Sequence, residues 1–352
     1  MDNIIYTTPE QQLDKLKEHH LIIENDDSAK DILSVFGYSN LIKSYRDPYI
    51  IISDGKKTYR SGVTLDQIFS LYLLDKELRN AVIASMLDLE EHIKESAADV
   101  VASSFGTHPD SYLKYSNYAN KRKRKTRFSL SAILSKMNET LLTDKDPIRH
   151  YREAHNIVPP WILFKSIYFS TIINFIDQFK VAQKNSLVSK LYDVSSLDIS
   201  EETARMIMMD TLFVCLEYRN IAAHGGRTYN YKSNYKLRTE QIIDSASDDT
   251  SADFSQLLFL LSLLKYQHPY MQLTQVLSRE VNRHCQLYPQ DVTYLAQILN
   301  VDIEPRRVVY ITSTSNKFHS DPHCSGLMDP LDIDLEHAIA NGYIPCKRCI
   351  KE

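Results

Sequence analysis

Residues 200 to 226 limit the possible folds of this chain most strongly, because they predict one long helix that is apolar on nearly every side. Ser200 is a favourable N-cap residue, and two glutamates follow it in the first turn, where the helix dipole stabilises carboxylates. The runs 206–209 and 212–216 are apolar, and Gly225-Gly226 supplies the left-handed stop typical of a helix C-terminus. Because such a helix has to be buried, the segment predicts a helical domain built around it.

The composition agrees with a mainly helical protein. Only eight of the 352 residues are glycine, which favours long helices with few turns, and 43% of the residues are hydrophobic. No apolar run approaches the roughly 18 residues that a membrane helix needs, and the first residues lack the features of a signal peptide. We therefore expect a cytoplasmic protein with no membrane partner. The net charge of −4 provides no general attraction to nucleic acid, so any RNA contact requires a local basic patch.

The last turns of the helix carry Arg219, Asn220 and His224. An arginine can neutralise a phosphate, an amide can orient it, and an imidazole titrates near neutral pH, so the three together can cut RNA without a metal ion. Asn220 and His224 share a helix face, but Arg219 and His224 lie roughly 140° apart around an ideal axis. Either the helix distorts at its end, or two copies of the chain each contribute part of a site. We favour the two-fold pair.

The Arg-Asn-x-x-x-His pattern resembles the Arg-x4-6-His motif of HEPN-domain ribonucleases, and the surrounding chain resembles the Abi family (AbiD/AbiF-like) of bacterial abortive-infection proteins. This second resemblance is carried by residues 9–13 with 36–41 and by residues 159–164 with 168–171. One departure is Ser170, where the family usually has glycine. The resemblance implies an all-helical HEPN fold, ribonuclease activity, a homodimer, and a role in phage defence or as a toxin regulated by a structured non-coding RNA.

The same motif can also have a purely structural role. Arg219 and His224 could cap carbonyl groups and interact with the dipole at the end of the helix, which is an ordinary role for basic residues. The chain would then be a non-catalytic RNA-binding protein on the same HEPN fold. A DNA-acting protein guided by its C-terminal tail is a third and weaker alternative.

Residues 105 to 128 interrupt the helical pattern and contain a basic insert. Tyr112, Tyr115 and Tyr118 precede six cations within seven residues. Aromatic rings that stack on bases, beside cations that neutralise phosphates, suit a single-stranded or looped RNA. A charge run of this kind can equally be a flexible, solvated loop. The predicted RNA-binding residues are Lys121, Arg122, Lys123, Arg124, Lys125 and Arg127.

Three of the five cysteines crowd the last thirty residues, which in a reduced compartment indicates a metal site and not disulfides. Cys346 and Cys349 form a CxxC pair, and Cys324 lies upstream with His319 and His323 beside it. Three thiolates and either histidine satisfy a tetrahedral zinc site. Four protein ligands leave no open position for a reacting water, so the site would be structural.

This tail also resembles the metal-binding segment of Ada-type repair proteins and similar small modules appended to other bacterial proteins. In that pattern the histidine after the aromatic residue corresponds to His319. The resemblance therefore implies His319, Cys324, Cys346 and Cys349 as the ligands of one structural Zn²⁺ ion, while catalysis would need no metal.

We predict a mainly α fold with two domains. Residues 1–300 would form a HEPN-like helical bundle with a small β-hairpin at about 48–55, and residues 306–352 would form a small α+β zinc module. Helical spacing also covers residues 9–20 and 28–44. A helix that starts with a capping box of Thr64 and Gln67 runs well past residue 90. The lone Cys215 and Cys285 are expected to be buried.

Together these features predict a metal-independent endoribonuclease. A ribose 2′-OH would attack the adjacent phosphodiester and leave a 2′,3′-cyclic phosphate and a 5′-OH end. His224 would act as general base or acid, Arg219 would clamp the non-bridging oxygens, and Asn220 would orient the phosphate or the imidazole.

Overall fold

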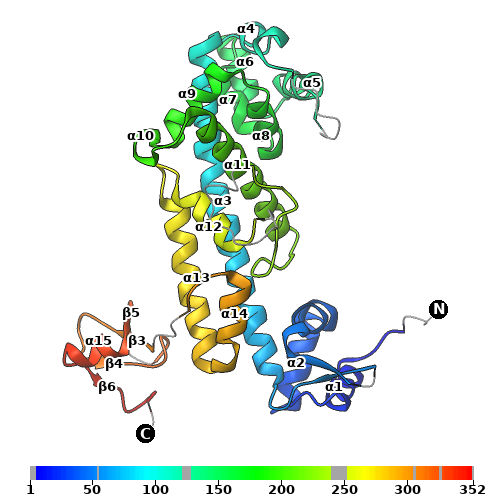
Figure 1. Cartoon of the computed structure of the whole chain (residues 1–352), viewed down its shortest axis with the longest axis vertical. Coiled ribbons are helices and arrows are strands. Elements are labelled where there is room, and N and C mark those ends of the chain that lie inside the picture. The colour runs from blue at the N-terminus through cyan, green and yellow to red at the C-terminus, as the bar shows by residue number, and fades with distance from the viewer. Residues whose placement is uncertain are drawn as a thin grey trace. The chain divides into compact units, whose positions relative to one another are not determined.

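The fold is seen in a computed structural model that describes residues 5–53, 55–120, 128–238, 252–303, 307–324 and 327–350. Over these residues the chain is mainly helical, with three small two-stranded sheets (Figure 1). The predicted fold class, mainly α with small β elements, is confirmed. None of the described helices is long and apolar enough to cross a membrane. The six predicted RNA-binding cations between 121 and 127 lie outside the described residues.

The chain forms two compact units. The terminal unit combines Met1–Glu77 with Val276–Glu352, and the central unit consists of Leu78–Gln275. Two long helices contribute residues to both units: α3 (Leu65–Phe105) and α13 (His268–Leu287).

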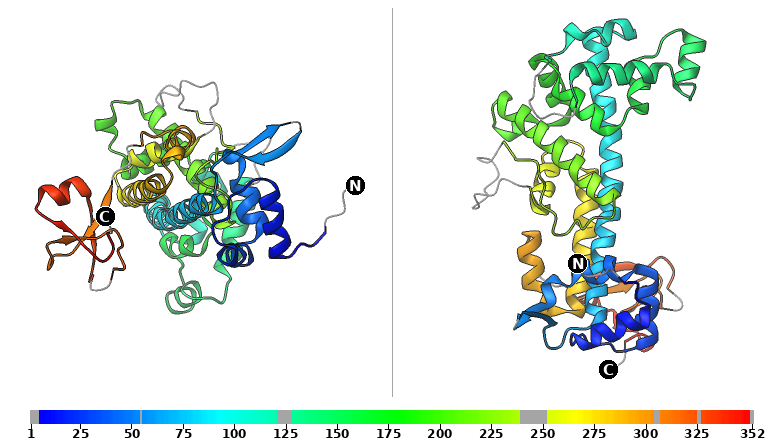
Figure 2. Two further views of the ribbon diagram at one scale, coloured as in Figure 1. Left: turned by 90° about the horizontal axis from the view of Figure 1, so that it is seen from below. Right: turned by 90° about the vertical axis from the view of Figure 1, so that its right-hand side faces the viewer.

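The central unit contains the rest of α3, the first residues of α13 and a set of shorter helices (Figures 1 and 2). The helix α11 (Glu201–Ala223) packs against α8, α9 and α12. Its buried residues include Cys215, as expected. The other helices of this unit are α4 (Pro109–Tyr112), η3 (Tyr115–Asn117), α5 (Leu130–Leu141), α6 (Ile148–His155), α7 (Pro160–Leu163), η4 (Phe164–Ser166), α8 (Phe169–Asp177), α9 (Val181–Leu191), α10 (Val194–Leu197) and α12 (Phe254–Ser262).

The two ends of α11 form as the sequence predicts. The Ser200 side chain accepts a hydrogen bond from the backbone nitrogen of Thr203 at 3.1 Å, which caps the first turn. Gly225 follows the helix with φ +70°, a conformation that favours glycine. A Cβ atom on Gly226 would lie 2.3 Å from Cδ1 of Ile221, so a larger residue here would force the Ile221 side chain to move. The long central helix and its glycine stop are therefore confirmed.

The terminal unit holds two N-terminal helices, a hairpin and a C-terminal helix. The hairpin strands pair from Ile50 with Tyr59 to Ser53 with Lys56, as predicted, while Asp54 of its turn lies outside the described residues. The helix expected over 28–44 instead ends at Phe36, because Gly37 adopts φ +78°. The elements are α1 (Pro9–Glu18), α2 (Asp26–Phe36), η1 (Ser39–Lys43), η2 (Asp47–Tyr49), β1 (Ile50–Ser53), β2 (Lys56–Tyr59), η5 (Pro289–Asp291) and α14 (Val292–Leu299).

The C-terminal segment of the same unit has its own small core. Val309, Phe318 and Ala338 are buried together, and five partly buried apolar side chains pack against them. The strands pair as β3 with β5, antiparallel, and β4 with β6, parallel. The elements are β3 (Val308–Ile311), β4 (Lys317–Phe318), β5 (Leu331–Asp334), α15 (Leu335–Ala340) and β6 (Ile344–Pro345).

Candidate functional site

The Arg-Asn-His motif lies where α11 ends. Arg219 and Asn220 are half-buried in the last turns of the helix, whereas His224 is exposed and is the C-cap residue. The backbone nitrogen of His224 donates to the carbonyl oxygen of Asn220 at 3.1 Å, which closes the final turn. Arg219 Nη1 lies 3.4 Å from Oδ1 of Asn220 and donates to it. The side chains of Arg219 and Asn220 therefore lie together, whereas the imidazole of His224 lies at the exposed end of the helix.

Arg219 and Asn220 line a pocket of about 350 Å³, which we call the Arg219 pocket. Its other walls come from residues 166–170, from Leu216, and from three charged side chains that the sequence did not assign to a site: Glu90, Lys94 and Lys165. Glu90 and Lys94 belong to a stretch of α3 that reads as an ordinary amphipathic helix. Their spacing of four residues was visible in the sequence, but only the fold brings it beside Arg219.

The charges in this pocket do not cancel. Glu90 Oε1 forms an ion pair of 2.7 Å with Nζ of Lys94, and the two side chains are only 14% and 12% exposed. Within the described part of the chain, neither Arg219 nor Lys165 forms an ion pair with a carboxylate. An arginine and a lysine that converge without a compensating acid suit an anion such as a phosphate.

His224 does not line the Arg219 pocket. The residue after it is instead held from α3, because Arg79 Nη1 donates to the carbonyl oxygen of Gly225 at 3.1 Å. A single chain thus places two of the three motif residues at one pocket and the third outside it. This arrangement agrees with the wide angle between Arg219 and His224 around the helix axis.

The segment after the motif is tied back to carboxylates of α11. Glu217 Oε2 accepts hydrogen bonds from Ser233 Oγ at 2.7 Å and from Tyr231 Oη at 3.1 Å. Burial, with Glu217 nearby, raises the pKa of Tyr231 to about 12, so this phenol keeps its proton at neutral pH. Asp210 holds the same segment through Tyr235 Oη at 2.9 Å. These hydrogen bonds therefore hold the segment that follows the motif against α11.

The structure corrects one expectation about the basic insert. Tyr112 is fully buried and donates to the carbonyl oxygen of Val158 at 2.7 Å, and Tyr118 is buried against Phe175. Neither ring can stack on an RNA base, because both belong to the core of the central unit. Tyr115, which is 47% exposed, is the one of the three that remains accessible.

Four side chains in the C-terminal segment converge as expected for a metal site. The ligand atoms of His319, Cys324, Cys346 and Cys349 all lie within 4.8 Å of one another. A tetrahedral ion with bonds of about 2.3 Å to sulfur separates its ligands by nearly 4 Å, so the cluster can hold a metal ion after small adjustments. His323 is exposed and stands outside the cluster.

Strand pairing places these ligands. The backbone nitrogen of Cys346 donates to the carbonyl oxygen of Phe318 at 2.9 Å, and His319 exchanges two backbone hydrogen bonds of 2.8 Å with Tyr310. The hydrogen bond from the backbone of Arg348 is the main cause that lowers the pKa of the Cys346 thiol, whereas burial is the main cause that raises the pKa of Cys324 to about 11. A bound metal would draw both toward the thiolate form that ligates it.

A family model described as Abi-like protein matches residues 31–230, more than half of the chain. The chain belongs to the Abi-like protein family. The resemblance seen in the sequence is thereby confirmed, and the matched range includes both α3 and the whole of α11. The family is named for abortive infection, so membership indicates a part in phage defence. No curated protein and no solved structure matches this Abi-like protein.

Proposed function

We propose that this Abi-like protein is a metal-independent endoribonuclease of HEPN type that acts in abortive infection or as a toxin. The observation that carries the proposal is the Arg219 pocket. It combines the motif residues Arg219 and Asn220 with Lys94 and Lys165, while the third motif residue, His224, is exposed outside the pocket. Arg219 and Lys165, which form no ion pair with a carboxylate within the described residues, can bind one phosphodiester and offset the charge of its transition state.

In this mechanism the chain supplies proton transfer and charge stabilisation. The 2′-OH attacks the adjacent phosphorus, the P–O5′ bond breaks, and the products are a 2′,3′-cyclic phosphate and a 5′-OH end. His224 removes the proton from the 2′-OH or protonates the leaving oxygen, Arg219 binds the non-bridging oxygens, and Asn220 orients them. Lys165 adds a second positive charge.

Metal independence is supported by the donors present. Glu90 is the one carboxylate among the described residues that line the Arg219 pocket, and its Oε1 is already paired with Lys94. Magnesium sites for phosphoryl chemistry usually need carboxylates that are free to bind the ion. The Arg219 pocket itself thus offers one unpaired carboxylate oxygen, Oε2 of Glu90, which favours acid–base chemistry by an imidazole over a magnesium site.

A homodimer would complete the site. His224 is exposed and lies outside the pocket that holds Arg219, so a partner copy across a two-fold axis can supply its histidine to this pocket. RNA is the proposed substrate, with the cations between 121 and 127 as an additional phosphate contact. We further propose that the ion in the C-terminal cluster is a structural Zn²⁺, because a closed set of one histidine and three cysteines suits zinc.

The second candidate is a non-catalytic RNA-binding protein, favoured by the helix-capping position of His224. The deciding experiment incubates the purified protein with total cellular RNA in EDTA and maps the new ends. We expect 2′,3′-cyclic phosphate and 5′-OH ends, and their loss in His224→Ala with RNA binding retained. Cleavage that stops in EDTA and returns with magnesium would overturn the mechanism. An absence of cleavage under all conditions, with RNA still bound, would favour the second candidate.

A further inference from the structure

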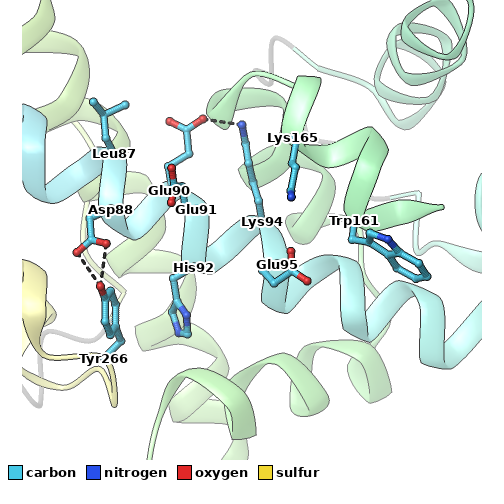
Figure 3. Close-up of a pocket in the computed structure, with 10 residues that line it drawn as sticks. All are labelled: Leu87, Asp88, Glu90, Glu91, His92, Lys94, Glu95, Trp161, Lys165 and Tyr266. Atoms are coloured by element: carbon cyan, nitrogen blue, oxygen red, sulfur yellow. Dashed lines mark hydrogen bonds and ion pairs between the residues drawn. The ribbon is translucent and has the colours of Figure 1, made fainter. Parts of the chain in front are cut away.

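A second pocket adjoins the Arg219 pocket along α3. It has a volume of about 780 Å³, within the range of small-molecule sites, and we call it the Trp161 pocket (Figure 3). The helix α3 lines it from Leu87 to Glu95, Trp161 comes from α7, and Tyr266 precedes α13. Glu90, Lys94 and Lys165 line both pockets, so one extended ligand can occupy the two together.

Several polar groups of the Trp161 pocket are already occupied by one another. Asp88 accepts from Tyr266 Oη at 2.8 Å and lies 2.7 Å from Nδ1 of His268. Glu90 uses Oε1 for its ion pair with Lys94. These contacts fix the walls of the pocket and do not contribute groups to a ligand.

Other groups remain available. Oε2 of Glu90 and Nε2 of His92 are buried, yet neither has a hydrogen-bond partner among the described residues. Burial lowers the pKa of His92, although Asp88 opposes the shift, so this imidazole is neutral at physiological pH and can accept a hydrogen bond. Glu91 and Glu95 are exposed and form no ion pair within the described ranges. Apart from the ammonium group of Lys165, the available groups are thus mainly hydrogen-bond acceptors.

A pocket that is rich in hydrogen-bond acceptors and has an aromatic wall favours a flat ligand that carries N–H donors. Carboxylates repel a phosphate but accept hydrogen bonds from N–H groups, and the indole of Trp161, which is 36% exposed, offers a flat surface for stacking. In the view of Figure 3 the Glu95 carboxylate lies below Lys165 and to the left of Trp161. Among the four RNA bases, guanine presents two adjacent N–H donors on its Watson–Crick edge, which one carboxylate can accept together.

We infer that the Trp161 pocket binds the guanine base of the nucleotide whose phosphate occupies the Arg219 pocket, with Glu95 accepting from its Watson–Crick edge and Trp161 stacking on the ring. Lys165, which lines both pockets, then lies between base and phosphate. The inference rests on the proposed ribonuclease function and gives it a specificity: cleavage next to guanosine. An arginine-rich peptide also offers paired N–H donors, but it would not use the cations of the adjoining pocket.

Trp161 provides a direct test, because it is the one tryptophan of the chain. The full-length protein is titrated with the 5′-monophosphates of guanosine, adenosine, cytidine and uridine while tryptophan fluorescence is recorded at the red edge of its absorption. We expect saturable quenching by guanosine monophosphate with a Kd about tenfold below that of the uridine compound. Glu95→Gln, which replaces an acceptor pair by an amide, should remove most of this preference. Glu153→Gln on α6, which lines neither pocket, is the matched control and should behave as the wild type.

Equal quenching by all four nucleotides, no quenching, or quenching by argininamide but not by guanosine monophosphate would overturn the inference. The outcome is separable from the ribonuclease proposal. RNA cleavage without a guanosine preference leaves the ribonuclease standing and removes the guanine pocket. Guanosine monophosphate binding that depends on Glu95, without any cleavage of RNA, retains the pocket as a nucleotide site and removes the enzyme.

Discussion

Arg79 of α3 donates a hydrogen bond from Nη1 to the carbonyl oxygen of Gly225 at 3.1 Å, directly after the exposed His224. The contact joins the helix that supplies Glu90 and Lys94 to the end of the helix that supplies Arg219 and Asn220. The position of the imidazole relative to the Arg219 pocket therefore depends on a residue far away in the sequence.

We expect Arg79→Gln to lower kcat ten- to a hundredfold, about the effect of misplacing a catalytic group by one ångström, while KM changes little. Arg79 would act as a positioning residue, since its contact to the motif is with backbone. Steady-state cleavage of a short RNA measures both constants. Arg79→Lys keeps a donor and should recover part of kcat. A variant that loses RNA binding and kcat in equal measure would show that Arg79 contacts the substrate itself.

The proposed shared site predicts complementation between two inactive chains. Refolding equal amounts of Arg219→Ala and His224→Ala chains makes about half of the dimers mixed, and each mixed dimer holds one intact composite site. The activity should then recover to about one quarter of the wild-type value. Each variant alone is the control. Mixed dimers verified by mass that stay inactive would place all three residues of a site on one chain.

The metal cluster predicts one zinc ion per chain, released in Cys346→Ser. A segment this small gains most of its folding free energy from the ion, so residues after about 306 should unfold while the helical core keeps its thermal midpoint. Metal analysis and proteolysis of the C-terminal segment measure the two effects. His319→Ala should lose the ion and His323→Ala should keep it, because only His319 lies in the cluster. Full zinc content in Cys346→Ser would contradict the site.

The terminal unit should lose stability in acid through Asp291. Tyr49 Oη donates to its carboxylate at 2.7 Å, Gln67 Nε2 at 2.9 Å, and Nε2 of His284 lies 2.9 Å away. Burial alone would raise the pKa of Asp291, but these hydrogen bonds, that of His284 first, outweigh it and lower the pKa below its ordinary value of 3.8. The folded carboxylate therefore binds its proton less readily than the unfolded one. The stabilisation is present above about pH 4 and is lost as the pH falls below it.

We expect Asp291→Asn to lower the free energy of unfolding by about 1–3 kcal/mol at neutral pH, since it replaces a buried carboxylate that accepts several hydrogen bonds. Urea unfolding followed by circular dichroism between pH 3 and 7, a range that spans the titration of a carboxyl group, measures the difference. The gap between wild type and variant should narrow toward the acid end. A gap that stays constant across this range would mean that Asp291 contributes through packing and not through its charge.

The sequence alone determined the features that depend on a few neighbouring residues. The cap at Ser200, the glycine stop after His224 and the hairpin form as predicted, because local hydrogen bonds and backbone preferences decide them. Of the capping box expected at Thr64, the bond from the Gln67 backbone to the threonine hydroxyl forms, whereas the Gln67 amide donates to Asp291 instead. The family was recognisable by resemblance, and spacing predicted a metal site of three cysteines with His319 or His323, of which the resemblance favoured His319. Gly37 shows what the periodicity of apolar residues cannot predict. The apolar spacing continues past this residue, but its left-handed backbone ends the helix.

Only the tertiary structure decided what surrounds the motif. Lys94 and Lys165 are 71 residues apart, and packing of the helices in the central unit, not any local pattern, brings both to the pocket of Arg219. The same packing buries Tyr112 and Tyr118, which the sequence could not distinguish from the exposed Tyr115. Burial and pocket formation depend on contacts between distant segments, and the free energy of those contacts is not encoded in the spacing of neighbouring residues.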